Sequence, residues 1–248
     1  MNSFLELKNI SKNFNTEKKI KVLNKLSYNF EKGKVYSLMG PSGSGKSTLL
    51  NLISLIDRPT NGSIKFDNTQ VNFKENNKND IFRARKIGIV YQQNNLLPDF
   101  SAFENLYLAS LSINNNKEIA MSKAQKLLKK IGLTSRSNHF PSQLSGGESQ
   151  RIAIARAIIN DPDIILADEP TGSLDIKTAK DIFTLLNNQK NPNRLIIFAT
   201  HNRFFAQKAD YLLELNDGSI KSTNDWVIFQ NLQSLKNTYS IFNMWGSS

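Results

Sequence analysis

Apolar and polar positions alternate in blocks along the chain, and these blocks predict an α/β fold. Residues 35–39, 164–167 and 195–199 are short, continuous apolar runs, which is the pattern of strands buried on both faces. Residues 179–188, between the last two runs, read as a helix. Apolar strands that alternate with helices predict a mostly parallel sheet with helices on both of its faces.

The N-terminal part of the chain has the pattern of an antiparallel subdomain. Residues 3–39 read as short strands separated by polar turns at 13–19 and 31–34, and the last strand runs into a glycine-rich loop. Further strands are predicted at 64–66 and 87–91. We therefore expect an antiparallel β subdomain that leads into the parallel sheet.

A helical subdomain is expected at about residues 95–160, where the pattern is mostly helical. One of its helices ends at Gly132 and has an apolar face formed by Ala124, Leu127, Leu128 and Ile131. Towards the end of the domain, Asn216-Asp217-Gly218 is typical of the turn of a β-hairpin. We expect these elements to form one domain over residues 1–224.

Residues 225–248 form an extension beyond this domain. Its large apolar residues step by four, three, four and three positions, at Ile228, Leu232, Leu235, Tyr239 and Phe242. This spacing predicts one face of an amphipathic helix. We favour packing of this face on the chain's own domain, and packing on a sister subunit or a membrane partner is the alternative.

The composition excludes several classes of protein. With 39% hydrophobic and 21% charged residues among 248, the chain has the composition of a globular protein with a sizeable core. No apolar run approaches the ~20 residues that cross a bilayer, and the first residues lack a secretory signal, so we expect a cytosolic protein. The absence of cysteine excludes disulfides and thiol-ligated metals.

The net charge of +11 allows three interpretations. A basic protein can bind nucleic acid, lie against an anionic membrane, or carry its charge on solvated faces. The basic residues here form no dense block, since Lys18-Lys19 and Lys129-Lys130 are only pairs. We favour diffuse solvation with some contribution from a nearby membrane.

The glycine-rich loop fits the phosphate-binding pattern G-x-x-x-x-G-K-[ST]. Its glycines allow backbone N–H groups to turn toward an anion, and the following helix directs its positive end to the same place. Lysine can reach the outer phosphates and serine can ligate Mg²⁺. An ordinary turn is the alternative, but the full motif between a strand and a helix predicts nucleoside triphosphate binding by Gly40, Pro41, Ser42, Gly43, Ser44, Gly45, Lys46, Ser47 and the adjoining Thr48.

Polar side chains follow the buried strands at the edge where this loop is expected. Asp168 and Glu169 end one strand, and we expect Asp168 to hold Mg²⁺ and Glu169 to orient the attacking water. His201 follows the next strand and can hydrogen-bond the γ-phosphate, and Gln92 follows strand 87–91 with an amide that suits Mg²⁺ and water. A solvated strand end and a structural histidine are the alternatives.

A second anion site is suggested by Leu144-Ser145-Gly146-Gly147-Glu148, which opens a helix over 148–160. Ser145 suits an N-cap and the glycines expose backbone N–H groups. A turn is the commoner meaning of such a stretch. A second anion site has a role if it faces the nucleotide of another copy of the chain.

Together these motifs resemble the ATP-binding subunit of an ABC transporter over residues 3 to about 222. In this comparison the loop is Walker A, Gln92 is the Q-loop glutamine, and Asp168 ends Walker B. Glu169 corresponds to the catalytic glutamate and His201 to the switch histidine. The resemblance further assigns a signature motif (Leu144, Ser145, Gly146, Gly147, Glu148), a D-loop (Ser173, Leu174, Asp175) and an adenine-stacking residue (Phe14).

The resemblance also implies the architecture and partners. It implies a RecA-like P-loop ATPase core that uses ATP and Mg²⁺, with Ser47, Gln92 and Asp168 at the metal. It implies a head-to-tail homodimer that sandwiches two ATP molecules, each between one chain's Walker loop and the other chain's Ser145 and Gly147. Two integral membrane subunits would complete the complex, and no nucleic acid is expected.

A narrower resemblance concerns the loop after the Q-loop glutamine. Residues 91–105 are similar to that region of lipoprotein-releasing ATPases of the LolD type, and 167–172 agree with the wider LolD, MacB and FtsE group. This implies an ATPase on the cytoplasmic face of the inner membrane that drives lipoprotein release. An efflux or cell-division ATPase of the MacB or FtsE type is the alternative, and a soluble ABC ATPase acting on DNA or ribosomes is more remote.

Two residues depart from the usual family pattern. Ser149 stands where the family commonly has glutamine after the signature glutamate, and Asn202 stands where it often has aspartate after the histidine. Neither removes a group that hydrolysis needs.

Overall fold

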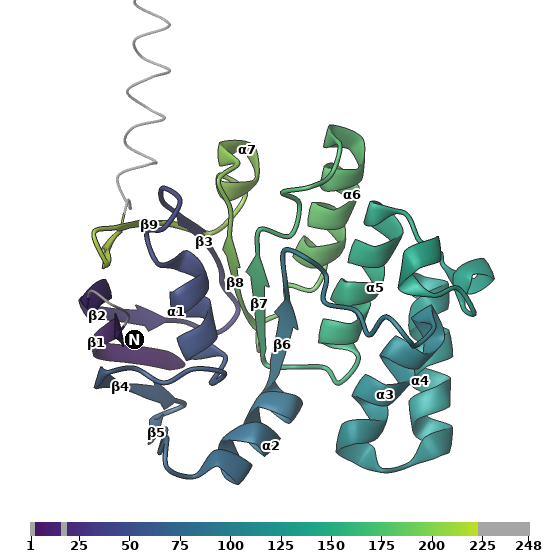
Figure 1. The fold of residues 1–248 in the computed structure, drawn as a ribbon, viewed down its shortest axis with the longest axis horizontal. Helices are drawn as coiled ribbons and strands as arrows, with labels where there is room; N and C mark the ends of the chain where they lie inside the picture. Colours follow the sequence, from purple (N-terminus) through teal and green to yellow (C-terminus); the bar gives the residue numbers. More distant parts are fainter. Residues whose placement is uncertain (1–2, 16–18, 223–248) are drawn as a thin grey trace, which may run out of the picture.

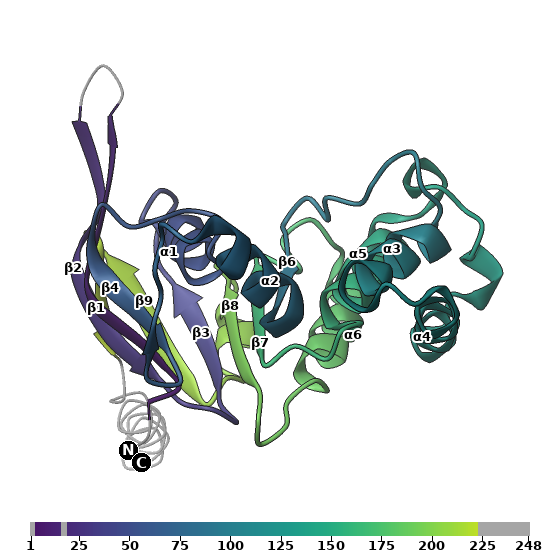
Figure 2. The same ribbon diagram turned by 90° about the horizontal axis from the view of Figure 1, so that it is seen from below.

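The computed structural model describes residues 3–15 and 19–222, which form two sheets and two groups of helices (Figure 1). Seen from below, an antiparallel sheet lies at one end, the parallel sheet lies in the middle, and a helical subdomain lies at the other end (Figure 2). The predicted extension over 225–248 lies outside the described residues. Within the described part, no helix is long and apolar enough to span a membrane.

The central sheet has the predicted parallel core. Its strands are, in spatial order, β10 (Ser219–Ser222), β9 (Tyr211–Asn216), β3 (Val35–Met39), β8 (Leu195–Ala199), β7 (Ile164–Asp168) and β6 (Ile87–Val90). All neighbouring pairs are parallel except β9 and β10, which form the hairpin expected at 216–218. The carboxyl ends of β3, β6, β7 and β8 therefore share one edge, which is where α/β proteins of this kind bind ligands.

The second sheet is antiparallel and comes mostly from the N-terminal part of the chain. Its order is β2-β1-β4-β5, with β1 (Leu5–Asn15), β2 (Lys19–Phe30), β4 (Asn61–Phe66) and β5 (Thr69–Gln70). The pairing of β1 with β2 shifts register three times, which gives β1 the irregularity expected of a strongly curved strand. This sheet corresponds to the antiparallel subdomain predicted from the sequence.

Helix α1 (Lys46–Ile53) lies between the two sheets (Figures 1 and 2). Its buried leucines and isoleucine pack in one cluster with apolar residues of both sheets. The strand β7 is buried on both faces, because its alternate side chains pack in two different clusters. Ile164 and Leu166 join the α1 cluster, whereas Ile165 and Ala167 face the opposite way.

The other face of the parallel sheet is covered by α5 (Gly146–Ile158) and α6 (Ile176–Asn187), with the short α7 (Arg203–Ala206) nearby. Both long helices bury aliphatic or aromatic side chains against Ile165 and Ala167. Helices therefore cover both faces of the sheet, as the alternation of apolar strands and helices predicts.

A third cluster forms the core of the helical subdomain. α3 (Ala102–Asn114), α4 (Lys117–Lys130) and two 3-10 turns, η1 (Thr134–Arg136) and η2 (Pro141–Gln143), pack with the outer side of α5. Ser101 caps α3 in a capping box with Glu104, and α4 buries Ala120, Ala124 and Leu128 on the predicted apolar face. The subdomain lies within the expected 95–160.

Two helices were absent from the sequence predictions, the short α7 and the longer α2. α2 (Asn76–Lys86) connects the antiparallel sheet to β6, and none of its residues is buried. Among its apolar side chains only that of Phe82 is partly buried, so the sequence shows no apolar periodicity that indicates a helix.

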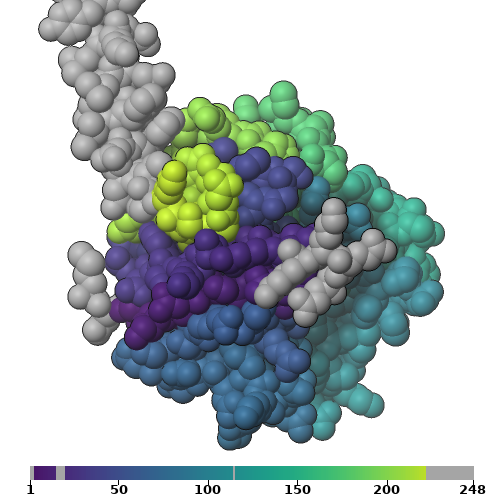
Figure 3. Space-filling model, turned by 60° about the vertical axis from the view of Figure 1, so that its left-hand side comes forward, coloured from purple at the N-terminus to yellow at the C-terminus, as the bar shows by residue number. Residues whose placement is uncertain are grey.

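The hairpin of β9 and β10 joins the two sheets on the side opposite α2. The N–H of Asn24 in β2 donates to the carbonyl of Gly218 at 2.9 Å. Gly218 has φ +70°, and a Cβ there would lie 2.7 Å from the carbonyl oxygen of Val22, so glycine is required by both conformation and space. In Figure 3 the yellow hairpin lies directly against the purple edge of the antiparallel sheet, where β10 contacts β2.

Candidate nucleotide-binding site

The glycine-rich loop leaves the carboxyl end of β3 and enters α1 at Lys46. Gly43 and Gly45 have φ of +78° and +102°, which lie in the left-handed region that favours glycine. Lys46 folds back along the loop, and its Nζ donates to the carbonyls of Gly40 at 2.8 Å and Pro41 at 3.0 Å. The loop, its ammonium group and the N-terminus of α1 therefore converge on one space suited to phosphate.

Glu169 and His201 form a pair at the ends of β7 and β8. Nδ1 of His201 lies 2.9 Å from Oε2 of Glu169, and the His201 backbone N–H donates to the same oxygen at 3.3 Å. The Glu169 side chain is only 12% exposed, whereas that of His201 is 70% exposed. Glu169 also has φ +46°, a costly conformation for a residue with a Cβ, and its N–H is held by the carbonyl of Ala199 at 3.0 Å. The carboxylate is therefore held in place from two sides.

These groups surround a cavity of about 540 Å³ at the carboxyl edge of the sheet. The cavity brings together residues that are far apart in sequence, and every predicted phosphate, metal and catalytic residue except Pro41 and Ser44 lines it. Its lining is Val22, Gly40, Ser42, Gly43, Gly45, Lys46, Ser47, Thr48, Gln92, Asp168, Glu169 and His201. Sequence reasoning missed Val22, which has no chemistry of its own but packs beside Gly45.

The polar groups of the cavity suit a magnesium ion. Ser47, Gln92 and Asp168 offer a hydroxyl, an amide and a carboxylate, which are the oxygen ligands that Mg²⁺ prefers. Within the described residues there is no cluster of three acidic or histidine side chains that could hold a metal unaided. A magnesium ion here would share its coordination with phosphate and water, as is usual for nucleotide sites.

The stretch from Leu144 to Glu148 lies outside this cavity, at the N-terminus of α5. The Ser145 hydroxyl accepts from the N–H of Glu148 at 3.3 Å, and Glu148 accepts from the N–H of Ser145 at 2.8 Å, which is a complete capping box. The Ser145 N–H, and then the guanidinium of Arg136 at 3.0 Å, hold the pKa of Glu148 below its usual range. The serine and the adjoining glycines are thus presented on a rigid helix end.

Gly147 is also constrained by packing inside the chain. A Cβ at this position would lie 2.5 Å from Cγ2 of Thr178 in α6. Glycine therefore allows α5 and α6 to approach closely, apart from any contact with a ligand.

The D-loop residues lie between β7 and α6. Asp175 is the N-cap of α6 and accepts from the N–H groups of Lys177 and Thr178, both at 3.0 Å. The Thr178 side chain, and then these backbone N–H groups, lower the pKa of Asp175. Leu174 lines a separate shallow cavity beside His201, and Ser173 is exposed. None of the three lines the phosphate cavity.

Phe14 is not among the residues that line the cavity either. It lies on β1, 40% exposed, and its neighbour Lys12 places its ammonium 4.9 Å from the ring centroid. Lys12 is in turn held by Asp57 at 2.6 Å. The ring therefore has one cation near it and a surface available to a second ring.

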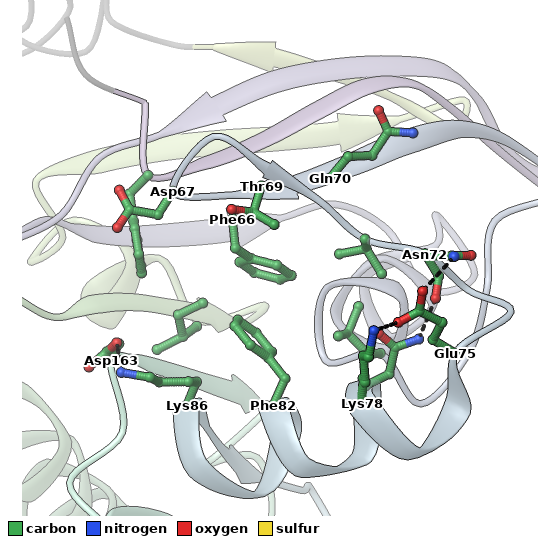
Figure 4. A pocket seen from close by; sticks show the side chains of 15 residues that line it. Phe66, Asp67, Thr69, Gln70, Asn72, Glu75, Lys78, Phe82, Lys86 and Asp163 are labelled. Atoms are coloured by element: carbon green, nitrogen blue, oxygen red, sulfur yellow. Dashed lines mark hydrogen bonds and ion pairs between the residues drawn. The ribbon is translucent and has the colours of Figure 1, made fainter.

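A different cavity of about 490 Å³ lies between the antiparallel sheet and α2 (Figure 4). The rings of Phe66 and Phe82 face each other in it with centroids 4.9 Å apart. Its lysines are already paired, Lys78 with Glu75 at 2.6 Å and Lys86 with Asp163 at 2.8 Å. With an apolar floor and neutralised charges, this cavity does not suit a polyphosphate.

Comparison with known proteins agrees with this geometry. A family model described as "ABC transporter" matches residues 23–172. The "Lipoprotein-releasing system ATP-binding protein LolD" of Rickettsia bellii is 42% identical over 88% of this chain and 98% of its own length. The protein of the same name from Ehrlichia ruminantium is 40% identical over 91% of this chain and 100% of its own.

Solved structures give the same match at the level of the fold. A dimeric ATP-binding cassette in a post-hydrolysis state, bound to ADP and inorganic phosphate, superposes with a TM-score of 0.81. It is 38% identical and covers 88% of this chain and 96% of its own.

Proposed function

The chain belongs to the ABC transporter family as an ATP-hydrolysing subunit, and from that membership we propose that it powers lipoprotein release from a bacterial inner membrane. The observation that carries the proposal is the phosphate cavity, in which loop, carboxylates, amide and histidine converge, in a chain about 40% identical to LolD proteins over most of its length. The subunit would act on the cytoplasmic face.

Different residues of the cavity bind the phosphates, hold the metal ion and accept the proton during hydrolysis. The loop N–H groups and Lys46, released from its own carbonyls, bind the β- and γ-phosphates. Ser47, Asp168 and Gln92 would hold Mg²⁺, which neutralises phosphate charge when bound. Glu169 accepts a proton from the attacking water, and His201 keeps the carboxylate oriented while its exposed side faces the γ-phosphate.

The site is completed by a second copy of the chain. Ser145 and Gly147 lie outside the cavity of their own chain, at a helix N-terminus that presents N–H groups. In a head-to-tail dimer they meet the γ-phosphate of the sister chain, and the D-loops from Ser173 to Asp175 lie along the interface. The dimeric state of the similar cassette supports this arrangement.

Phe14 is proposed to stack on adenine. Its exposed ring lies on β1, and β2 beside it contributes Val22 to the cavity. Stacking on a ring discriminates little between bases, so this contact supplies affinity more than selectivity.

A groove beside residues 91–95, the loop that contains Gln92, suits the membrane subunits. It has a volume of about 390 Å³ and lies between α2 and β6 on one side and α3 and α5 on the other. Tyr91 and Asn95 line it, so a segment bound there lies close to Gln92. We infer that each of two lipoprotein-releasing membrane subunits inserts a short cytoplasmic segment into this groove.

Reconstitution tests the proposal. The chain would be purified with the membrane subunits encoded beside it and placed in liposomes that carry a triacylated lipoprotein. ATP should release the lipoprotein to a soluble acceptor, and the same complex with Glu169→Gln should not. Stimulated ATP turnover without release would favour the MacB or FtsE type, and DNA-stimulated turnover that salt abolishes would favour a soluble ABC ATPase.

A further inference from the structure

Helix α4 carries positive charge that the rest of the described chain does not neutralise. Its 14 residues hold a single acid, Glu118, against five lysines, which are Lys117, Lys123, Lys126, Lys129 and Lys130. Among the described residues, no carboxylate forms an ion pair with any of these lysines. Helix α2 differs, because its Lys78, Arg83 and Lys86 all form ion pairs. The charge of α4 is therefore left to solvent or to a partner.

The stability of α4 explains only part of this charge. Lys129 and Lys130 lie in the last turn, where cations interact favourably with the helix dipole. Lys117 lies in the first turn, where a cation is unfavourable. Lys126 is three positions from both Lys123 and Lys129 and four from Lys130, and like charges at these spacings destabilise a helix. The fold of α4 therefore does not account for Lys117, Lys123 and Lys126.

Three of the lysines share one side of α4 with an exposed apolar residue. We call this side the lysine strip, and its members are Ile119, Lys123, Lys126 and Lys130. They are spaced by four, three and four positions, which aligns them along a helix over about 16 Å. A different side of α4 is buried, so the strip is not required for packing. Ile119 is 47% exposed although its side chain is large and apolar.

The helical subdomain places α4 close to the groove assigned to the membrane subunits. Ala109 and Ser112 of α3 line that groove, and α3 and α4 pack side by side (Figure 1). In Figure 2, α4 lies at the end of the molecule opposite the antiparallel sheet. A chain that docks on a membrane subunit through this groove therefore also brings α4 towards the bilayer.

We propose that the lysine strip binds anionic phospholipid head groups of the membrane that holds the membrane subunits. Head-group phosphates supply the negative charge that α4 lacks, and a basic amphipathic helix is typical of contact with a membrane surface. Each lysine near an anionic surface raises affinity roughly five-fold, so the three lysines of the strip together correspond to roughly 100-fold. Ile119 adds an apolar contact at the boundary of the acyl chains. The inference rests on the proposed membrane location of the chain and not on its cargo.

Binding of the full chain to vesicles tests the strip. The strip variant combines Lys123→Gln, Lys126→Gln and Lys130→Gln. A control variant loses the same net charge outside the helical subdomain, with glutamine at three exposed lysines that form no ion pair in the described structure: Lys8, Lys74 and Lys221.

Sedimentation with vesicles measures the affinity of each form of the chain. The unaltered chain should bind vesicles that contain phosphatidylglycerol in preference to vesicles of phosphatidylcholine alone, at about 0.1 M salt. The strip variant should bind the anionic vesicles about 100-fold more weakly, and the control variant less than about five-fold more weakly. Equal losses in the two variants, or equal binding to the two kinds of vesicle, would overturn the inference.

Thermal unfolding separates a membrane contact from a structural role of the lysines. The strip variant removes repulsion around Lys126 but also the favourable charge of Lys130 at the helix end, so we expect Tm to stay within about 2 °C of the unaltered chain. A clear fall in Tm together with unchanged binding to anionic vesicles would show that the lysines serve the fold, and would overturn the inference.

A fluorescent label tests whether α4 itself meets the membrane. The chain has no cysteine, so Ile119→Cys can be labelled alone, with Lys74→Cys as the control. Anionic vesicles should move the emission of the label on α4 to shorter wavelength and leave that of the control label unchanged. Vesicle binding without this shift, or tighter binding of the strip to a DNA duplex than to the vesicles, would overturn the inference. Failure of lipoprotein release by a complex whose strip still binds vesicles would instead contradict the proposed function.

Discussion

Replacing Glu169 by glutamine tests the assignment of the base most directly. The substitution keeps the size of the side chain and an oxygen that can accept from the His201 N–H, which lies 3.3 Å from Oε2. It removes the negative charge, and with it the ability to take a proton from water. Because the side chain is 12% exposed and its shape is kept, we expect stability to change by less than about 1 kcal/mol.

The effect on turnover should be much larger than the effect on folding. A positioned general base contributes about 10²–10⁴-fold to rate, which corresponds to about 2.7–5.5 kcal/mol of barrier. We expect kcat of Glu169→Gln to fall by at least about 100-fold while the Kd for MgATP stays within about three-fold. With hydrolysis blocked, the ATP-bound dimer should accumulate.

The assay is phosphate release at saturating MgATP, with binding measured separately by calorimetry and dimer formation by light scattering. Asp181→Asn is the matched control, because Asp181 is an exposed acid of α6 that loses the same charge away from the cavity. A kcat for Glu169→Gln within a few-fold of the control would refute the role of Glu169. A variant that stays monomeric at saturating MgATP would refute the shared site.

Three further predictions concern the phosphate cavity, the N-terminus of α5 and the core. Lys46→Met should weaken MgATP binding at least about ten-fold in calorimetry without lowering Tm, because its ammonium bonds only to its own loop. Because the pKa of Glu148 is depressed in the folded chain, its ionised form stabilises the fold at pH values above the ordinary glutamate pKa of about 4.3. This contribution is lost as the pH falls through the lower pKa of the folded chain. Glu148→Gln should therefore lower Tm at pH 7, and its difference in Tm from the unaltered chain should shrink below about pH 4. Leu166→Ala, at a fully buried position, should lower the free energy of unfolding in urea by about 2–5 kcal/mol, whereas an equal cost for exposed Leu97→Ala would contradict the assigned core.

The sequence allowed the fold to be predicted wherever burial imposes a period. β7 and β8 are buried on both faces and therefore read as continuous apolar runs. α6 was predicted at 179–188 and spans Ile176–Asn187, because the helix begins at the Asp175 cap and not at its first buried residue. α2 has a single apolar side chain packed against the core, that of Phe82, so its sequence carries no apolar period from which a helix could be predicted.

The sequence predicted only those site residues whose side-chain chemistry suggests their role. Asp168 and Glu169 are recognisable as acids at a strand end, but nothing in the sequence indicates that Nδ1 of His201 lies 2.9 Å from Glu169. Val22 was missed because its role is purely spatial.

The place of β3 within its sheet has a consequence during synthesis. The strand that leads into the glycine-rich loop pairs with β8 and β9, which begin at Leu195 and Tyr211. During translation β3 leaves the ribosome long before β8 and β9 have been synthesised. Its backbone therefore has neither of its partner strands to pair with until most of the domain has been translated. We therefore expect the strand that leads into the glycine-rich loop to gain both of its neighbours only after β9 has been translated.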